Sequence, residues 1–180
     1  FKKYIKFWKR FTIRIESRLV DTKVMKKLAS VGYTEKEYNY QYSIPADGNS
    51  DLKPINGKKF LSKNLKETSM NPEFLIFSKG SRPKKQKRLI LIEDKKEKVQ
   101  LGLFSKMKDK KNLTKLALTD VYHYALELLT KTEEVKEILA IAVAGEKLDA
   151  HAIYIYKNIE VNDKYAKNVE VIDNEISLIK

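Results

Sequence analysis

Residues 72–96 read PEFLIFSKGSRPKKQKRLILIEDKK, and this stretch decides the fold. Two apolar runs of strand length, residues 74–77 and 89–92, flank a basic segment that contains the turn-favouring residues glycine, serine and proline. The stretch therefore predicts an antiparallel hairpin whose turn lies within residues 79–87.

Each apolar run is joined directly to a carboxylate, because Glu73 precedes the first run and Glu93 follows the second. Lys95 lies two positions later. Side chains alternate across a strand, so Glu93 and Lys95 project from one face, and Glu73 joins them there if the runs pair. Such a set suits a divalent metal ion beside a cation. Glutamate and lysine are also common at strand ends, so the pattern alone fits an ordinary hairpin with solvated charges equally well.

The composition bounds the class of protein. The chain has 180 residues, of which 42% are apolar and 34% charged, as expected of one folded domain. Its net charge of +13 attracts polyanions such as nucleic acid, acidic lipid or acidic proteins, although AT-rich genomes also inflate lysine. The absence of cysteine excludes disulfides, thiolate metal sites and cysteine nucleophiles. No apolar run is long enough to cross a bilayer, which predicts a cytoplasmic protein without a membrane partner.

The chain begins with aromatic and basic residues at helical spacing. They predict an amphipathic helix over residues 1–15 that packs on a core or lies on a membrane or nucleic acid. A second helical pattern starts at residue 16 and ends near Gly32, a favourable C-cap. Glu16 lies four residues before Val20 on the apolar stripe, where it either occupies an exposed end or points into a site beneath the helix. Because the first residue is Phe, we expect the chain to be a fragment.

The remaining elements follow similar patterns. We expect a weak strand at residues 38–43, a helix at 114–131, strands at 136–145 and 152–156, and a hairpin formed by 169–172 and 176–179. A strand joined through a helix to another strand of the same sheet normally runs parallel to it. The sequence therefore predicts an α/β fold with a mixed central sheet flanked by helices.

Four segments of the chain, in their order, resemble a known family. They are NPEFLI at residues 71–76, LIEDK at 91–95, YHYA at 122–125 and ILAIAVAG at 138–145. Together they resemble the PD-(D/E)xK nuclease fold, and more narrowly the N-terminal endonuclease domain of type I and fused type II (type IIG) restriction-modification enzymes. The resemblance covers roughly residues 16–157. It implies a restriction-endonuclease-like three-layer core within a single nuclease domain over residues 1–180, with 158–180 as a C-terminal hairpin or connector.

The chain departs from the family pattern at one acid and is ambiguous at another. The family normally has Asp at the first acid, where this chain has Glu73, which is one methylene longer. The second strand allows two frames, Glu93 with Lys95 or Asp94 with Lys96. The apolar run ends immediately before Glu93, and the family pattern agrees, so we choose the first frame. Asp94 is then expected on the opposite face.

The resemblance implies hydrolysis of DNA phosphodiester bonds with Mg²⁺, for which Mn²⁺ can substitute. Glu73, Glu93 and the backbone carbonyl of Asp94 would supply oxygen ligands to the metal ion. Lys95 would orient the attacking water or offset developing charge. Glu16 matches a helix acid that binds a second metal ion or its water, and it completes the expected catalytic set.

The resemblance also implies supporting and DNA-binding residues. Tyr124 and His123 match a supporting motif, although both also suit packing or a phosphate contact. Basic residues near the hairpin turn are expected to bind the backbone of double-stranded DNA without reading its sequence: Lys84, Lys85, Lys87 and Arg88. The chain carries neither an adenine-methyltransferase motif nor a translocase motif. The resemblance therefore assigns methylation and target recognition to domains or subunits outside this chain.

Other hypotheses remain open at this point. One is a stand-alone repair or junction nuclease of the same fold, and another is a DNA-binding or assembly domain on that scaffold that does not cut. A membrane-surface protein is a third, which rests on residues 1–15 alone. The acid–acid–lysine set is complete, and this favours an active endonuclease.

Overall fold

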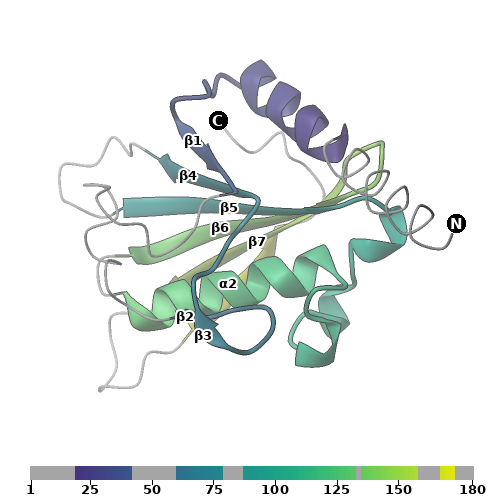
Figure 1. Cartoon of the computed structure of the whole chain (residues 1–180). Coiled ribbons are helices and arrows are strands. Elements are labelled where there is room, and N and C mark those ends of the chain that lie inside the picture. The colour runs from purple at the N-terminus through teal and green to yellow at the C-terminus, as the bar shows by residue number, and fades with distance from the viewer. Residues whose placement is uncertain (1–18, 42–59, 79–86, 133–134, 158–166, 173–180) are drawn as a thin grey trace, which may run out of the picture.

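The computed structural model describes residues 19–41, 60–78, 87–132, 135–157 and 167–172. The predicted helix at 1–15, most of the hairpin turn and the predicted strand at 176–179 lie outside the described residues. The described residues form three layers, with a mixed sheet between helix 19–30 and helix α2 (Ala117–Lys131) (Figure 1). The predicted α/β class and the mixed sheet are thereby confirmed.

The central sheet contains six described strands, whose bounds are β1 Tyr38–Tyr40, β4 Phe74–Ser78, β5 Lys87–Lys95, β6 Val135–Ala144, β7 Asp149–Lys157 and β8 Lys167–Ile172. Their order in the sheet is β1–β4–β5–β6–β7–β8. Strands β5 and β6 run parallel, and the other described neighbours run antiparallel. The predicted hairpin is therefore β4–β5, and α2 makes the predicted crossover between the parallel strands.

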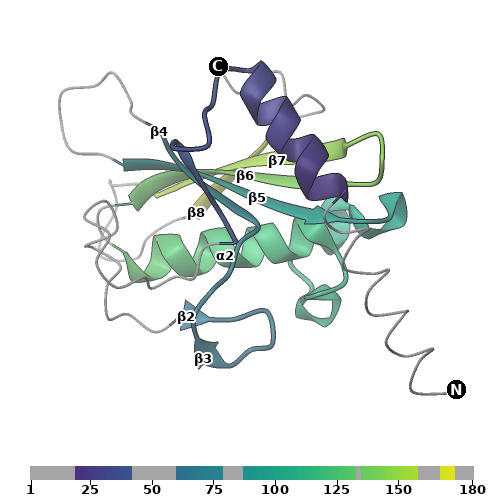
Figure 2. The ribbon, with the colours of Figure 1, turned by 45° about the horizontal axis from the view of Figure 1, so that its top comes forward.

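The two faces of the sheet bury separate apolar clusters, because successive side chains of a strand point to opposite sides. Leu75 and Leu91 pack on the α2 side, whereas Phe74 and Ile92 pack with helix 19–30. Figure 2 shows helix 19–30 lying over the strands on the side away from α2. Strands β5 and β6 are covered on both sides, which is why their sequences are unbroken apolar runs.

A polar segment in which the sequence pattern predicted no strand forms a second, two-stranded sheet. Strand β2 (Phe60–Leu61) pairs antiparallel with β3 (Glu67–Thr68) and contacts α2. Phe60 and Met70 are fully buried in the core on the α2 side. These two core residues stand alone in a polar stretch, so neither the strand period nor the helix period is visible in the sequence.

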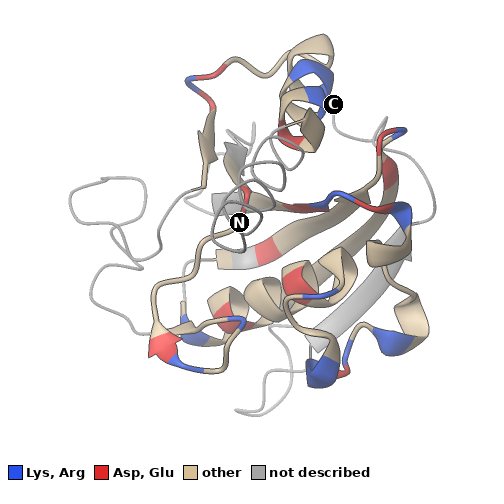
Figure 3. Ribbon diagram, turned by 45° about the vertical axis from the view of Figure 1, so that its right-hand side comes forward, with Lys and Arg blue, Asp and Glu red and all other residues tan. Residues whose placement is uncertain are grey.

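Short helical turns lead from β5 to α2. Three 3-10 helices, η2 (Lys98–Gln100), η3 (Phe104–Lys106) and η4 (Lys110–Asn112), form the lysine-rich connection, and lysines colour parts of it blue in Figure 3. Helix α2 then begins three residues later than the sequence predicted. None of the helices in the described part of the chain is both long and apolar enough to span a membrane.

Helix 19–30 ends in a Schellman motif at Gly32, which adopts a φ of +97°. The Gly32 N–H donates to the carbonyl of Ala29 at 3.1 Å, and the Tyr33 N–H donates to that of Leu28 at 3.0 Å. These bonds satisfy carbonyls that the last helical turn leaves without partners. The C-cap predicted at Gly32 is confirmed.

Replacing Gly32 with Ala should lower the free energy of unfolding by about 1 kcal/mol, because a Cβ disfavours the left-handed conformation. Apart from Gly32 and its two chain neighbours, no described residue comes within 4 Å of the added Cβ, so the loss of stability isolates the backbone effect. Urea unfolding measures the change. Gly32→Asn is the matched control and should lose less, since asparagine tolerates positive φ. Equal stability of the Ala variant and the wild-type protein would contradict the prediction.

Candidate active site

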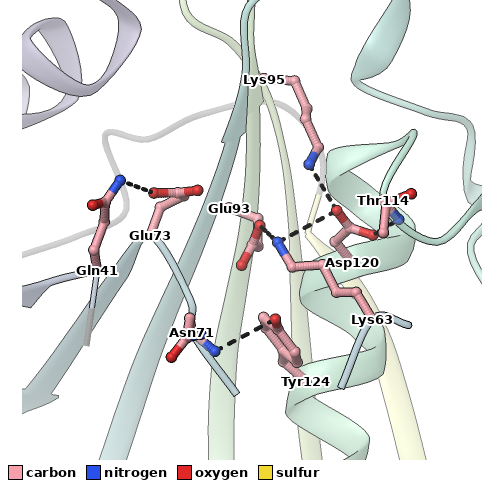
Figure 4. Close-up of polar contacts among 9 residues, drawn as sticks. All are labelled: Gln41, Lys63, Asn71, Glu73, Glu93, Lys95, Thr114, Asp120 and Tyr124. Carbon is pink, nitrogen blue, oxygen red and sulfur yellow. Dashed lines mark hydrogen bonds and ion pairs between the residues drawn. The ribbon is translucent and has the colours of Figure 1, made fainter. Parts of the chain in front are cut away.

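The register of the β4–β5 hairpin brings the predicted carboxylates together. Phe74 lies opposite Ile92 in this pair. Glu73 and Glu93 are each one position beyond it, so they face each other across the two strands. Lys95 follows two positions after Glu93 on the same face. Figure 4 shows the three side chains at neighbouring strand ends. The structure thus gathers the predicted acid–acid–lysine set on the side of the sheet that α2 covers.

The Glu93 carboxylate is fully buried, and its partner is a lysine that the sequence did not single out. Lys63, in the turn after β2, places its Nζ 2.7 Å from Glu93 Oε2. The other oxygen, Glu93 Oε1, is buried and has no hydrogen-bond partner among the described residues. Because an unpaired buried carboxylate is strongly disfavoured, the Lys63 ion pair is a condition for burying Glu93.

A second buried acid, Asp120 in the first turn of α2, holds both lysines of the site. Its Oδ2 lies 2.8 Å from Lys95 Nζ and 3.6 Å from Lys63 Nζ. Its Oδ1 accepts a hydrogen bond of 2.7 Å from the backbone N–H of Thr114. The helix N-terminus also favours a negative charge at this position. Asp120 therefore fixes Lys95 and Lys63 on the same side of Glu93, as Figure 4 shows.

Burial is the main cause of the shifted pKa values of the acids at the site. Desolvation raises the pKa of Glu93 to about 7, although the charge of Lys63 acts in the opposite sense. Desolvation also raises the pKa of Glu73. A hydrogen bond of 3.2 Å from Gln41 Nε2 acts in the opposite sense and lowers this pKa. Burial by itself lowers the pKa of Lys63, but Glu93 and Asp120 outweigh it and raise the pKa above its ordinary value. An added cation beside Glu93 would therefore be electrostatically favoured.

Asp94 lies on the opposite face of the sheet, as the chosen frame predicts. Its carboxyl is hydrogen-bonded to that of Asp21 on helix 19–30, and Tyr40 donates a hydrogen bond to Asp21. Burial, followed by the bond and the charge of Asp21, raises the pKa of Asp94 to about 9. The two neighbours Glu93 and Asp94 thus belong to different clusters on different sides of β5.

The two predicted supporting residues of α2 have distinct contacts. Tyr124 is buried, and its ring centroid lies 5.1 Å from Lys63 Nζ. Its hydroxyl accepts a long hydrogen bond of 3.5 Å from the backbone N–H of Asn71. His123 instead donates from Nε2 to the carbonyl of Leu61 at 2.7 Å. Tyr124 therefore lines the site, whereas His123 anchors β2 to α2.

The remaining predicted residues lie either outside the described part of the chain or at the other end of β5. Glu16, Lys84 and Lys85 lie outside the described residues. Lys87 and Arg88 begin β5, whereas Glu93 lies near its other end. Arg88 and Glu93 are thus separated by roughly 17 Å along the strand, from a rise of about 3.3 Å per residue. The backbone of Lys87 and Arg88 therefore lies at one end of the β4–β5 hairpin, and the two carboxylates lie at the other end.

The structure adds residues that sequence patterns did not identify, and each comes from another element. Lys63 follows β2, Gln41 follows β1, and Asp21 and Asp120 lie on the two helices. Asp120 carries a weak signal, since an acid in a first helical turn is favoured, but that preference predicts a helix start and not a site. Among the described residues, no group of three or more His, Asp or Glu side chains is arranged to hold a metal ion. A metal ion here would depend on two carboxylates, a backbone carbonyl and water.

Comparisons with known proteins do not assign the chain to a family. No protein-family model, curated protein or solved structure matches it. The functional assignment therefore depends on the geometry of the site and on the resemblance of its motifs.

Replacing Asp94 with Asn should stabilise the protein, and the gain should grow as the pH rises from about 4 to about 9. Across this window the folded state holds the Asp94 proton more tightly than the unfolded state, so wild-type stability falls as the pH rises. Asparagine stays neutral and can donate to Asp21, so we expect a gain of several kcal/mol near the upper end. Urea unfolding at both ends of the window measures it.

The exposed Glu35→Gln substitution is the matched control, because it also removes one carboxylate. It should leave the pH dependence of stability unchanged. An Asp94→Asn gain that is the same at both ends of the window would show that Asp94 titrates normally in the folded protein.

Proposed function

We propose that this chain is the endonuclease domain of a restriction-modification enzyme, and that it hydrolyses DNA phosphodiester bonds with Mg²⁺. The observation that supports this most is the buried Glu93 carboxylate, which lies one position beyond the Phe74–Ile92 pair as Glu73 does, neighbours Lys95 and keeps one oxygen without a hydrogen-bond partner in the described part of the chain. The element order also supports the finer fold. A helix, a strand that follows an acid, a strand that ends in Glu-x-Lys, a helix and a parallel strand agree with the PD-(D/E)xK pattern.

The residues present fit a divalent metal ion. Glu93 Oε1 is a buried oxygen to which none of the described residues donates a hydrogen bond. Glu73 and the backbone carbonyl of Asp94 add oxygen ligands, which Mg²⁺ prefers together with several waters. When bound, the ion supplies polarisation of the phosphoryl oxygen and a water of lowered pKa. The ligand set is small, as suits a metal ion that shares its coordination with a substrate phosphate.

Lys95 provides the second chemical function of the site. Its Nζ is held 2.8 Å from Asp120, and its side chain is 17% exposed, so it is both oriented and reachable by a substrate. From there Lys95 orients the attacking water or offsets the charge that develops on the phosphate during hydrolysis. Asp120 keeps the ammonium on the Glu93 side of β5, where the metal ligands lie.

Double-stranded DNA is the substrate that the charge favours. The net charge of +13 attracts the phosphate backbone, and exposed lysines follow the site along the connection between β5 and α2. Backbone contacts of this kind give affinity without sequence choice. We therefore assign target recognition and methylation to partner domains or subunits.

Two other functions fit specific observations. A stand-alone repair or junction nuclease would use the same carboxylates and lysine. A non-cleaving DNA-binding domain is favoured by the Lys63 ion pair, because Lys63 already neutralises Glu93 without a metal ion.

Glu73→Gln, Glu93→Gln and Lys95→Met should each reduce nicking of supercoiled plasmid in Mg²⁺ or Mn²⁺ by about 100-fold or more, because each removes a group that stabilises the transition state. Gel electrophoresis of the plasmid measures the rate. Lys36→Gln removes an exposed lysine between helix 19–30 and β1 and should leave the rate within about twofold. Equal nicking by the wild type and the three site variants would rule out this site, and an inactive wild type would favour the non-cleaving domain.

Millimolar Mg²⁺ or Ca²⁺ should raise the melting temperature of the wild-type protein, because a ligand that binds only the folded state stabilises it. Glu73→Gln and Glu93→Gln should each remove this shift. Differential scanning calorimetry without DNA gives the result independently of catalysis. Glu35→Gln, which removes an exposed carboxylate, should retain the full shift. The same shift in Glu93→Gln would place the metal ion elsewhere.

A further inference from the structure

The β2–β3 hairpin is held against α2 by two hydrogen bonds, one to the backbone N–H of Leu61 and one to its carbonyl. The Leu61 N–H donates to Glu127 Oε2 at 2.9 Å, and the Leu61 carbonyl accepts from His123 Nε2 at 2.7 Å. Glu127 is itself paired with Lys131 at 3.1 Å, and Phe60 is fully buried beside it. Lys63 lies two residues after this anchor, so its position relative to α2 is well defined.

Lys63 and Lys95 are the accessible cations above buried carboxylates. Their side chains are 16% and 17% exposed, whereas those of Glu93 and Asp120 have no exposed surface. The two lysine side chains therefore keep some exposed surface, whereas the carboxylates that they contact have none. Both amines contact Asp120 Oδ2, so they lie within the span of one phosphate group. An anionic group such as a phosphate can therefore reach both ammonium groups, while the Glu93 carboxylate beside them favours a cation.

The contacts of Lys63 with the described residues do not use all of its hydrogen-bond donors. An ammonium group has three N–H donors. One is directed to Glu93 Oε2 at 2.7 Å, and the 3.6 Å approach to Asp120 is an ion pair beyond ordinary hydrogen-bond length. The face of Tyr124 limits Lys63 on another side. Lys63 therefore keeps donor capacity for a phosphate oxygen while it still holds Glu93.

We propose that Lys63 is a second phosphate-binding residue of the site, and that it binds the same phosphodiester as Lys95. Identifying that phosphodiester as the one that is cut rests on the proposed function. Lys63 has two contacts in this proposal, since it orients Glu93 through Oε2 and binds the substrate with a remaining donor. The β2–β3 hairpin is then the element that brings this substrate contact to the sheet.

Fluorescence anisotropy with a short fluorescein-labelled DNA duplex tests the proposal. The full chain is titrated in Ca²⁺, which accepts the same oxygen ligands, so that binding is measured without relying on cleavage. Lys63→Gln should weaken binding about tenfold more than the Lys36→Gln control, which removes the same charge at a remote turn. It should also reduce the slope of log K against log salt by about 0.9, the value for one lost phosphate contact. Lys63→Arg should bind within about twofold of the wild type, because it keeps the charge.

A charge-conserving double variant separates a phosphate contact from mere neutralisation of Glu93. Lys63→Gln leaves the buried Glu93 charge unpaired and can therefore unfold the protein. Lys63→Gln combined with Glu93→Gln removes both charges and keeps the net charge of the wild type. This variant should be folded by circular dichroism and should still bind the duplex about tenfold more weakly than Glu93→Gln alone.

Binding and cleavage are measured separately, so the phosphate contact of Lys63 and the nuclease assignment can each fail independently. If the double variant binds as well as Glu93→Gln, or if Lys63→Gln binds as well as Lys36→Gln, Lys63 only neutralises Glu93 and the proposal is wrong. Plasmid nicking in Mg²⁺ is scored separately. Loss of binding through Lys63 in a protein that never nicks would uphold the phosphate contact and overturn the nuclease assignment. Nicking that depends on Glu93 and Lys95 but not on Lys63 would uphold the nuclease assignment and overturn the phosphate contact of Lys63.

Discussion

The candidate site depends on the burial of one carboxylate, that of Glu93, near the end of β5. Removing an ionised carboxylate from water costs several kcal/mol even after the protein relaxes, so a cation is required nearby. The closest candidate within the sheet, Lys95, contacts Asp120 instead. The counter-charge comes from Lys63, which lies outside the central sheet. Packing of the β2–β3 hairpin on α2 and burial of Glu93 are therefore mutually dependent.

Alternation along β5 keeps two groups of acids apart. Glu93 belongs with the lysines on the α2 side, whereas Asp94 belongs with Asp21 and Tyr40 beneath helix 19–30. A slip of one residue in the register of β5 would exchange the two acids and reverse every apolar contact of the strand. The apolar residues on the two faces thus determine which carboxylate meets the lysines, because a slip would place the leucines of β5 in the cluster under helix 19–30 and its isoleucines in the cluster on the α2 side.

Much of the framework was predictable from the sequence, because it follows from periodicity. The β4–β5 hairpin, the parallel β6, the α2 crossover and the Gly32 cap were each predicted and are observed. The convergence of Glu73, Glu93 and Lys95 on one face follows from the alternation of two runs. Lys63 and Asp120 were missed because their importance arises from tertiary contacts. A single lysine in a polar turn has no pattern, and an acid in the first turn of a helix is ordinary.

The anchoring of β2 to α2 also has a meaning for folding. Lys63 and Glu93 are 30 residues apart, and His123 and Leu61 are 62 residues apart, so the site is assembled from segments distant in the chain. Such contacts are slow to form, because the chain must close large loops before they stabilise it. A chain in which only the local β4–β5 hairpin has formed brings two of the acids together, but Lys63 and Asp120 are not yet in contact with the rest of the site. The complete site is thus a late product of folding, and a partly folded chain does not contain it.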